Sequence, residues 1–130
     1  ILYPDRSVAG DTDTNDASIV ARLVYGEREF LFTGDVSRDI EEYLLWLDSD
    51  SVEADVLKGG HHGSRTSTSP LFLSWVDPEH AVISAGADNR YGHPHEDVLD
   101  ALGAEDVMVH ETADGRVRFV SDGLTLTLHQ

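Results

Sequence analysis

Residues 54–67 read ADVLKGGHHGSRTS, and the interpretation of the whole chain starts from this stretch. A short apolar run ends at Lys58, and two adjacent histidines follow it between glycines. Neutral imidazole is a common metal ligand, and glycines let an ion or a substrate approach the backbone closely. The alternative is a histidine-rich surface loop, because none of the familiar two-histidine metal spacings is present. The stretch predicts a strand over 54–58 that ends in a candidate site at His61 and His62.

The length and hydropathy of the chain indicate one modest α/β domain. Its 130 residues are 40% apolar, enough for a core, and no apolar run approaches the ~20 residues that span a bilayer. We expect a single partial domain over 1–130, with a loop-rich lead-in over 1–17 and no membrane contact from the segment itself. The first residue is not methionine, so we expect a soluble piece of a longer protein. Its localisation stays open, with a membrane-anchored or an exported parent among the options.

The charge of the chain narrows the classes of function. It has 25 Asp and Glu against nine Lys and Arg, and the net charge is −16. Only one of the basic residues is lysine, and an Asp-rich, Lys-poor composition is typical of halophilic proteins, which suggests a haloarchaeal source and folding that requires molar salt. An acidic surface argues against coating nucleic acid, which normally takes a basic face. There is no cysteine, so any metal must be held by His, Asp and Glu, which suits zinc, manganese or iron.

Apolar periodicity and turn residues predict the order of the elements. Strands are expected at 18–25 and 30–33, forming a hairpin, followed by a helix over 37–48 with Ser37 as its N-cap. A helix from Pro70 to Val76 follows the histidine loop, a strand spans 80–86, and a helix opened by Pro94 stops at Gly103. The tail predicts three strands, 106–110, 116–120 and 124–129, with Asp-Gly hairpin turns at 114–115 and 122–123.

The expected strands end in polar loops, where α/β folds place their chemistry. Asp35 follows the buried strand FLFTG and could face a cleft rigidly, or could be a turn or helix-capping residue. His93, in the stretch NRYGHPH, could transfer protons, or could cap the helix that Pro94 opens. Other polar residues in these loops could cradle a phosphate, and the candidates are Ser64, Arg65, Asn89 and Arg90.

Three motifs in this order resemble one family. They are NDASIVARLVYGEREFLFTGD (15–35), ADVLKGGHHGSRTSTSPLFL (54–73) and PEHAVISAGADNRYGHPHEDVLDAL (78–102), followed by a short G-R-V strand. The chain resembles the metallo-β-lactamase-fold domain at the C-terminal end of ComEC-type DNA-uptake (competence) proteins and their stand-alone relatives. The resemblance implies a four-layer αββα fold with two divalent ions, zinc or manganese, between two sheets. It also implies a phosphodiesterase or nuclease that acts on single-stranded DNA or another phosphodiester.

The resemblance also implies roles for individual residues. Asp35 is expected to bridge the two metals, and one histidine of the pair, taken as His61, to be the last histidine ligand. The catalytic candidates are then His62 and His93, and Ser64, Arg65, Asn89 and Arg90 are the candidates for substrate binding.

The chain departs from the family in one respect. The family's main ligand cluster, His-x-His-x-Asp-His, does not occur, and no histidine precedes His61. We therefore expect only the C-terminal αβ half of the fold, a mixed sheet with helices on one face. The isolated piece is expected to bind metal weakly or not at all and to be inactive. A homodimer could replace the missing N-terminal half. The alternatives are a non-catalytic association module and a hydrolase of small-molecule esters.

Overall fold

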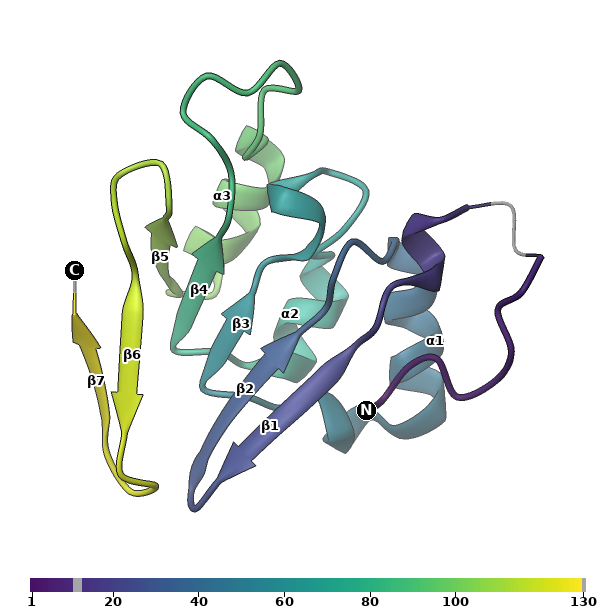
Figure 1. Ribbon diagram of the computed structural model, residues 1–130, viewed down its shortest axis with the longest axis horizontal. Coiled ribbons are helices and arrows are strands. Elements are labelled where there is room, and N and C mark those ends of the chain that lie inside the picture. Colours follow the sequence, from purple (N-terminus) through teal and green to yellow (C-terminus); the bar gives the residue numbers. More distant parts are fainter. Residues whose placement is uncertain (11–12, 130) are drawn as a thin grey trace.

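The computed structural model describes residues 1–10 and 13–129, and its main feature is a five-stranded mixed sheet (Figure 1). The strand order is β1-β2-β3-β4-β5; β1 is antiparallel to β2, and the other neighbours are parallel. The strands are β1 (Ala21–Tyr25), β2 (Arg28–Phe32), β3 (Val56–Lys58), β4 (His80–Ile83) and β5 (Met108–Glu111). A separate hairpin joins β6 (Arg118–Ser121) to β7 (Leu126–His129).

Three helices cover one face of this sheet, and each connects two parallel strands (Figure 1). They are α1 (Arg38–Asp48), α2 (Pro70–Val76) and α3 (Glu96–Ala104), with short 3₁₀ turns at Asn15–Ala17, Ser49–Val52 and Gly60–Gly63. The core lies between the two layers, where Leu31, Leu57 and Ile83 of the sheet are buried with Leu44 and Phe72 of the helices. Since crossovers between parallel strands need a helix, this alternation of strands and helices confirms the predicted α/β half-fold.

Local sequence signals explain most of the element boundaries. Gly26 forms the β1–β2 turn at φ 64°, a conformation that glycine adopts without steric cost. Ser69 caps α2 by accepting a hydrogen bond from the backbone N–H of Phe72, with Pro70 in the first turn as predicted. Ser37 occupies the N-cap position of α1 but makes no side-chain capping bond. Its backbone N–H instead donates to Asp16, which ties the helix to the lead-in.

Two predictions about the second half of the chain were wrong. The strand that begins at Met108 does not form a hairpin through Asp114-Gly115; it extends the main sheet beside β4, and β6 pairs with β7 through the turn at 122–123. After β5, the Asp114 N–H donates to the Glu111 carbonyl and the Gly115 N–H donates to the Thr112 carbonyl, so this turn leads out of the main sheet to the separate β6–β7 hairpin. Helix α3 begins at Glu96 rather than at Pro94 and continues past Gly103 to Ala104.

The lead-in is partly integrated into the core. Tyr3 is fully buried and forms an isolated antiparallel bridge with Val20, and its ring contacts the Tyr43 ring of α1 edge to face. Residues 11 and 12 of the expected loop lie outside the described residues. None of the helices in residues 1–10 and 13–129 has the length and apolar character that crossing a bilayer requires.

The face of the sheet opposite the helices is largely open. On this face Leu23 and Phe32 are about half exposed, while Leu31, which points the other way, is fully buried. Phe119 of β6 covers only one part of it, with its ring 5.2 Å from that of His80. One face is thus packed and the other keeps apolar side chains in solvent, as expected for one half of a four-layer fold.

Candidate functional site

The parallel strands direct their polar loops to one edge of the sheet. Because β2, β3, β4 and β5 are parallel, their carboxyl ends meet there. A hollow of about 290 Å³ at this edge is lined by Asp35, His61, His62, Tyr91 and His93. A second hollow, of about 530 Å³, shares three of these residues and extends to the loop after β4, with lining residues His62, Ser84, Ala85, Gly86, Asn89, Tyr91, His93 and Thr112. The fold therefore brings together residues that are far apart in sequence.

The two adjacent histidines have an uncommon backbone conformation. His61 and His62 both have positive φ, 45° and 57°, in the left-handed region that non-glycine residues rarely adopt. The His61 N–H donates to the carbonyl of Gly34, 3.0 Å away, so the histidine loop is tied to the turn that carries Asp35. Strain of this kind persists only where surrounding contacts enforce it, and it is concentrated at functional sites.

Gly63 joins the histidine loop to the loop that carries His93. Its φ is +81°, and a Cβ added there would lie 2.6 Å from the Cβ of Pro94. Its carbonyl accepts a hydrogen bond from the His95 N–H at 2.9 Å. This close backbone approach requires glycine, and it places His93 beside the pair.

His62 and Asp35 face each other across the hollow. The Nε2 atom of His62 lies 3.6 Å from Oδ2 of Asp35. The Nδ1 atom of His62 lies 2.5 Å from the carbonyl oxygen of Ser84. A carbonyl can only accept a hydrogen bond, so Nδ1 carries a proton, and in the neutral tautomer the lone pair is then on Nε2, which faces the carboxylate. Two electron-pair donors that point at one position make a place suited to a cation.

Lys58, the last residue of β3, borders the same carboxylate. Its ammonium donates to the carbonyl of Gly34 at 3.1 Å and lies 3.8 Å from Oδ1 of Asp35. Burial lowers the pKa of Lys58, and the Asp35 carboxylate partly opposes that effect. Asp35 is therefore in the turn after β2, with its carboxylate between an ammonium and an imidazole. It does not cap α1, whose N-cap residue is Ser37.

His61 and His93 complete a histidine-rich wall. Nδ1 of His61 lies 3.2 Å from Oγ1 of Thr66, and the His61 and His93 rings are 6.0 Å apart. The pKa of His93 is lowered, chiefly by burial and further by His95, His61 and His62. The interpretation of His93 as a helix cap was wrong, because His95 is the N-cap residue of α3.

The loop residues predicted to bind substrate make mainly local contacts. The side chain of Asn89 donates to the carbonyls of Gly86 and His93 and accepts from two backbone N–H groups, so it organises its own loop. Arg90 lies over the ring of Tyr91 and donates to its hydroxyl at 2.7 Å.

The remaining two candidates lie in the histidine loop. The Ser64 hydroxyl is buried and lies 3.0 Å from that of Thr66, whereas Arg65 is exposed and donates its backbone N–H to His95. Substrate binding by these four residues, including Asn89 and Arg90, stays a prediction.

The hollow brings together two residues of the chain that could hold a metal with good geometry. Within residues 1–10 and 13–129, no three His, Asp or Glu side chains lie close enough together to bind one ion. Catalytic zinc sites use three protein ligands for each ion. Asp35 and His62 therefore fit part of a metal site but do not form a complete one.

Sequence reasoning missed some residues near the site. Tyr91 lines the hollow and Lys58 lies beside Asp35, and the signal for Lys58 was that it is the only lysine in the sequence and directly precedes the glycines. Another pairing joins strands rather than loops: Nδ1 of His80 lies 3.1 Å from Nε2 of His110 across β4 and β5. No sequence signal linked these two histidines, because they are thirty residues apart.

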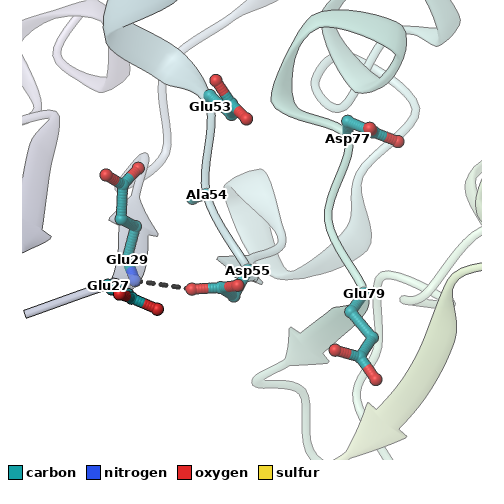
Figure 2. A pocket seen from close by; sticks show the side chains of 7 residues that line it. All are labelled: Glu27, Glu29, Glu53, Ala54, Asp55, Asp77 and Glu79. Atoms are coloured by element: carbon teal, nitrogen blue, oxygen red, sulfur yellow. Dashed lines mark hydrogen bonds between the residues drawn. The ribbon is translucent and has the colours of Figure 1, made fainter. Parts of the chain in front are cut away.

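The hollow at the opposite edge of the sheet is lined mainly by acidic residues. Its volume is about 240 Å³, and its lining residues are Glu27, Glu29, Glu53, Ala54, Asp55, Asp77 and Glu79 (Figure 2). The Asp55 carboxylate accepts from the backbone N–H of Glu29 at 2.7 Å and from Arg28 at 2.9 Å. Its hydrogen bonds are therefore made within the sheet, between β2 and the start of β3.

Relatives of the chain are competence proteins, although no protein-family profile matches it. It is 39% identical to ComE operon protein 3 of Bacillus subtilis over 98 residues, and this alignment covers 75% of the chain. It is 41% identical over 100 residues to competence protein ComA of Neisseria gonorrhoeae, 77% of the chain, and 36% identical over 115 residues to recombination protein 2 of Haemophilus influenzae, 86% of it. The chain is homologous to a segment of competence proteins. It spans only 12% to 14% of the length of these relatives.

Proposed function

We propose that the chain supplies the C-terminal part of a divalent-metal hydrolase site that cleaves phosphodiesters, single-stranded DNA above all, in a protein of DNA uptake. The observation that carries this proposal is the convergence of Asp35 Oδ2 and His62 Nε2, 3.6 Å apart, at the carboxyl ends of adjacent parallel strands. Homology to competence proteins supports the biological setting.

The geometry favours His62 over His61 as the histidine ligand. The Nδ1 atom of His62 is held by the Ser84 carbonyl, which fixes the ring and leaves Nε2 directed at Asp35. Metal-binding histidines commonly donate their other ring N–H to a carbonyl in this way. His61 instead contacts the Thr66 hydroxyl and faces His93. This assignment exchanges the roles that the resemblance implied for the two histidines.

The proposed site is incomplete within these residues. Asp35 and His62 supply two ligands, and the other ligands would come from a part of the protein that corresponds to the rest of the longer relatives. Zinc or manganese bound there would generate a nucleophile at neutral pH and stabilise negative charge on phosphate oxygens. The 130-residue chain by itself is then expected to bind metal weakly and to be inactive.

The chain's own residues would prepare this chemistry. Asp35 would offset the charge of the ions, and the Ser84 carbonyl would keep the imidazole of His62 in one tautomer. His93, whose pKa is lowered by burial, would be largely neutral near pH 7, and its exchangeable proton lies beside the hollow. Lys58 would add positive charge next to the carboxylate.

Hydrolysis by the longer protein tests the proposal. Its cleavage of single-stranded DNA should depend on Mn²⁺ or Zn²⁺, and Asp35→Ala should lower kcat/KM by roughly 100-fold or more. Glu79→Ala, which removes an exposed carboxylate at the opposite edge of the sheet, is the matched control and should retain wild-type activity. Metal-independent cleavage, or full activity of Asp35→Ala, would contradict the proposal. Faster hydrolysis of a small phosphodiester than of DNA would point to the small-molecule alternative.

The open face of the sheet favours one alternative function. Apolar side chains on this face are about half exposed, and such surfaces commonly bind other protein surfaces. A non-catalytic association module, or a homodimer that covers the face, would use it. Such a module predicts a stable dimer by light scattering in high salt and no metal-dependent hydrolysis by the longer protein.

A further inference from the structure

Glu41 is a carboxylate buried in the middle of helix α1. Its residue exposure is 1%, and it lies among core residues on the helix face that is directed toward α2. A buried carboxylate is costly unless hydrogen bonds replace its hydration. Burial raises the pKa of Glu41, and bonds from the Ser69 and Thr68 backbone oppose that shift. Because burying this carboxylate costs free energy, we expect Glu41 to have a role beyond packing.

The Glu41 carboxylate binds the backbone at the end of the histidine loop. One oxygen accepts from the N–H of Thr68, and the other accepts from the N–H of Ser69 at 2.9 Å. Thr68 has φ 56°, so the carboxylate holds a residue in the left-handed region. The Thr68 hydroxyl in turn accepts from the N–H of Gly60, at the start of the same loop, at 3.1 Å. Glu41 is thereby connected to both ends of the loop 60–69.

Other bonds tie this loop to the segment that carries Asp35. The Arg38 N–H donates to the Thr66 carbonyl at 2.9 Å, and the Ser67 hydroxyl donates to the Val36 carbonyl at 2.6 Å. The loop also contains three non-glycine residues with positive φ: His61, His62 and Thr68. A loop with this much strain would relax if its anchors were removed. Among these anchors Glu41 is the ionisable side chain, and it is almost completely buried.

We propose that Glu41 is a positioning residue that holds the histidine loop so that His62 faces Asp35 across the candidate site. Its influence on metal binding rests on the proposed function, whereas its influence on the loop does not. Glu41 does not line the hollow, and it acts through the backbone of Thr68 and Ser69.

Hydrogen exchange in the 130-residue chain tests the structural part. In Glu41→Gln, one amide oxygen can still accept, but the amide NH₂ would oppose a backbone N–H. The His61 N–H is the best probe, because it bonds to Gly34 and does not contact Glu41. We expect this amide to exchange at least about 10-fold faster, while amides of β3 and β4 change much less. Glu42→Gln, at the exposed neighbouring position, is the control and should match the wild type.

Metal titration of the longer protein tests the consequence for the site. Glu41→Gln should raise the Mn²⁺ concentration for half-maximal cleavage of single-stranded DNA by about 10-fold or more. A lower folded fraction would also raise this concentration, because the metal binds folded protein, so circular dichroism without metal measures the folded fraction and the half-saturating concentration is corrected for it. An unchanged half-saturating concentration would overturn the proposal, and so would His61 exchange that changes only in step with β3 and β4. If the wild type lacks metal-dependent cleavage, the proposed function fails, and the exchange experiment alone decides on Glu41.

Discussion

The two edges of the main sheet are both rich in charge, but they differ in chemistry. At the carboxyl edge, a carboxylate, an ammonium and three imidazoles from different loops meet at Asp35, Lys58, His61, His62 and His93. At the amino edge, six carboxylates surround a hollow, and Asp55 is held by the backbone of β2 and by Arg28 (Figure 2). A high density of acidic residues therefore does not identify a site in this chain.

The difference lies in what each hydrogen bond accomplishes. The Asp55 contacts stabilise pairing between strands that are already adjacent, so they contribute to folding. The contacts of the histidine loop instead hold strained residues and leave Asp35 and His62 with lone pairs that point at each other. Strained residues at a functional edge lower the stability of the fold, whereas the contacts of a structural edge raise it.

The largest expected effect on stability comes from Gly63 at the carboxyl edge. Gly63→Ala should lower the free energy of unfolding by roughly 2–4 kcal/mol, because alanine at φ +81° is strained and its Cβ would overlap Pro94. Urea denaturation followed by circular dichroism measures this. Gly86→Ala, where an added Cβ meets no atom within 4 Å, is the matched control and should change stability by less than about 0.5 kcal/mol. Equal effects of the two substitutions would mean that the loops are not packed together.

Removing the charge of Asp55 should lower the stability of the fold more than removing the charge of Asp35. Asp55→Asn weakens two bonds to β2 and should cost about 1–2 kcal/mol of unfolding free energy. Asp35→Asn should change stability by less than about 1 kcal/mol, since its ion pair with Lys58 is long and partly exposed. The same urea titrations compare them. A larger loss of stability for Asp35→Asn would remove the distinction between the structural and the functional edge.

Between the two edges, the pair His80–His110 should make stability depend on pH. Burial, together with neighbouring His80, lowers the pKa of His110 below its ordinary value near 6.5. The unfolded chain therefore binds a proton first as the pH falls, so stability is complete above about pH 6.5 and is lost below it.

His110→Gln should flatten that loss of stability. Denaturation midpoints between pH 7.5 and 5.5 measure the difference, with His129→Gln, at an exposed position, as control. An identical pH slope in both variants would contradict a role for the pair.

The smallest expected effect concerns the acidic edge. Salt should stabilise the chain by screening its carboxylates, and neutralising Glu27, Glu53 and Asp77 together should raise low-salt stability by about 1 kcal/mol or less. Thermal melts in dilute buffer and in molar salt measure both. A sharp melt of the wild type at low ionic strength, unchanged in the triple variant, would argue against a salt-dependent, halophilic fold.

Much of the fold followed from local patterns. The β1–β2 hairpin, the Ser69-Pro70 start of α2 and the turn at 122–123 were predicted correctly, because each depends on neighbouring residues. The tail was not, because Asp114-Gly115 is as good a hairpin signal as Asp122-Gly123, and only packing against β4 decides which strand β5 joins. His95 rather than His93 is the N-cap residue of α3, and His93 lines the hollow of the candidate site.

The sequence by itself determined the order of strands and helices and placed histidines and a carboxylate after apolar runs. It could do so because hydrophobic periodicity and turn chemistry act over a few residues. Only the tertiary structure decided which atoms meet. His62 rather than His61 faces Asp35, because the carbonyl of Ser84, twenty-two residues away in the chain, orients its ring. Glu41 reaches the histidine loop for the same kind of reason: burial and backbone bonds between distant segments are set by packing, which no local pattern records.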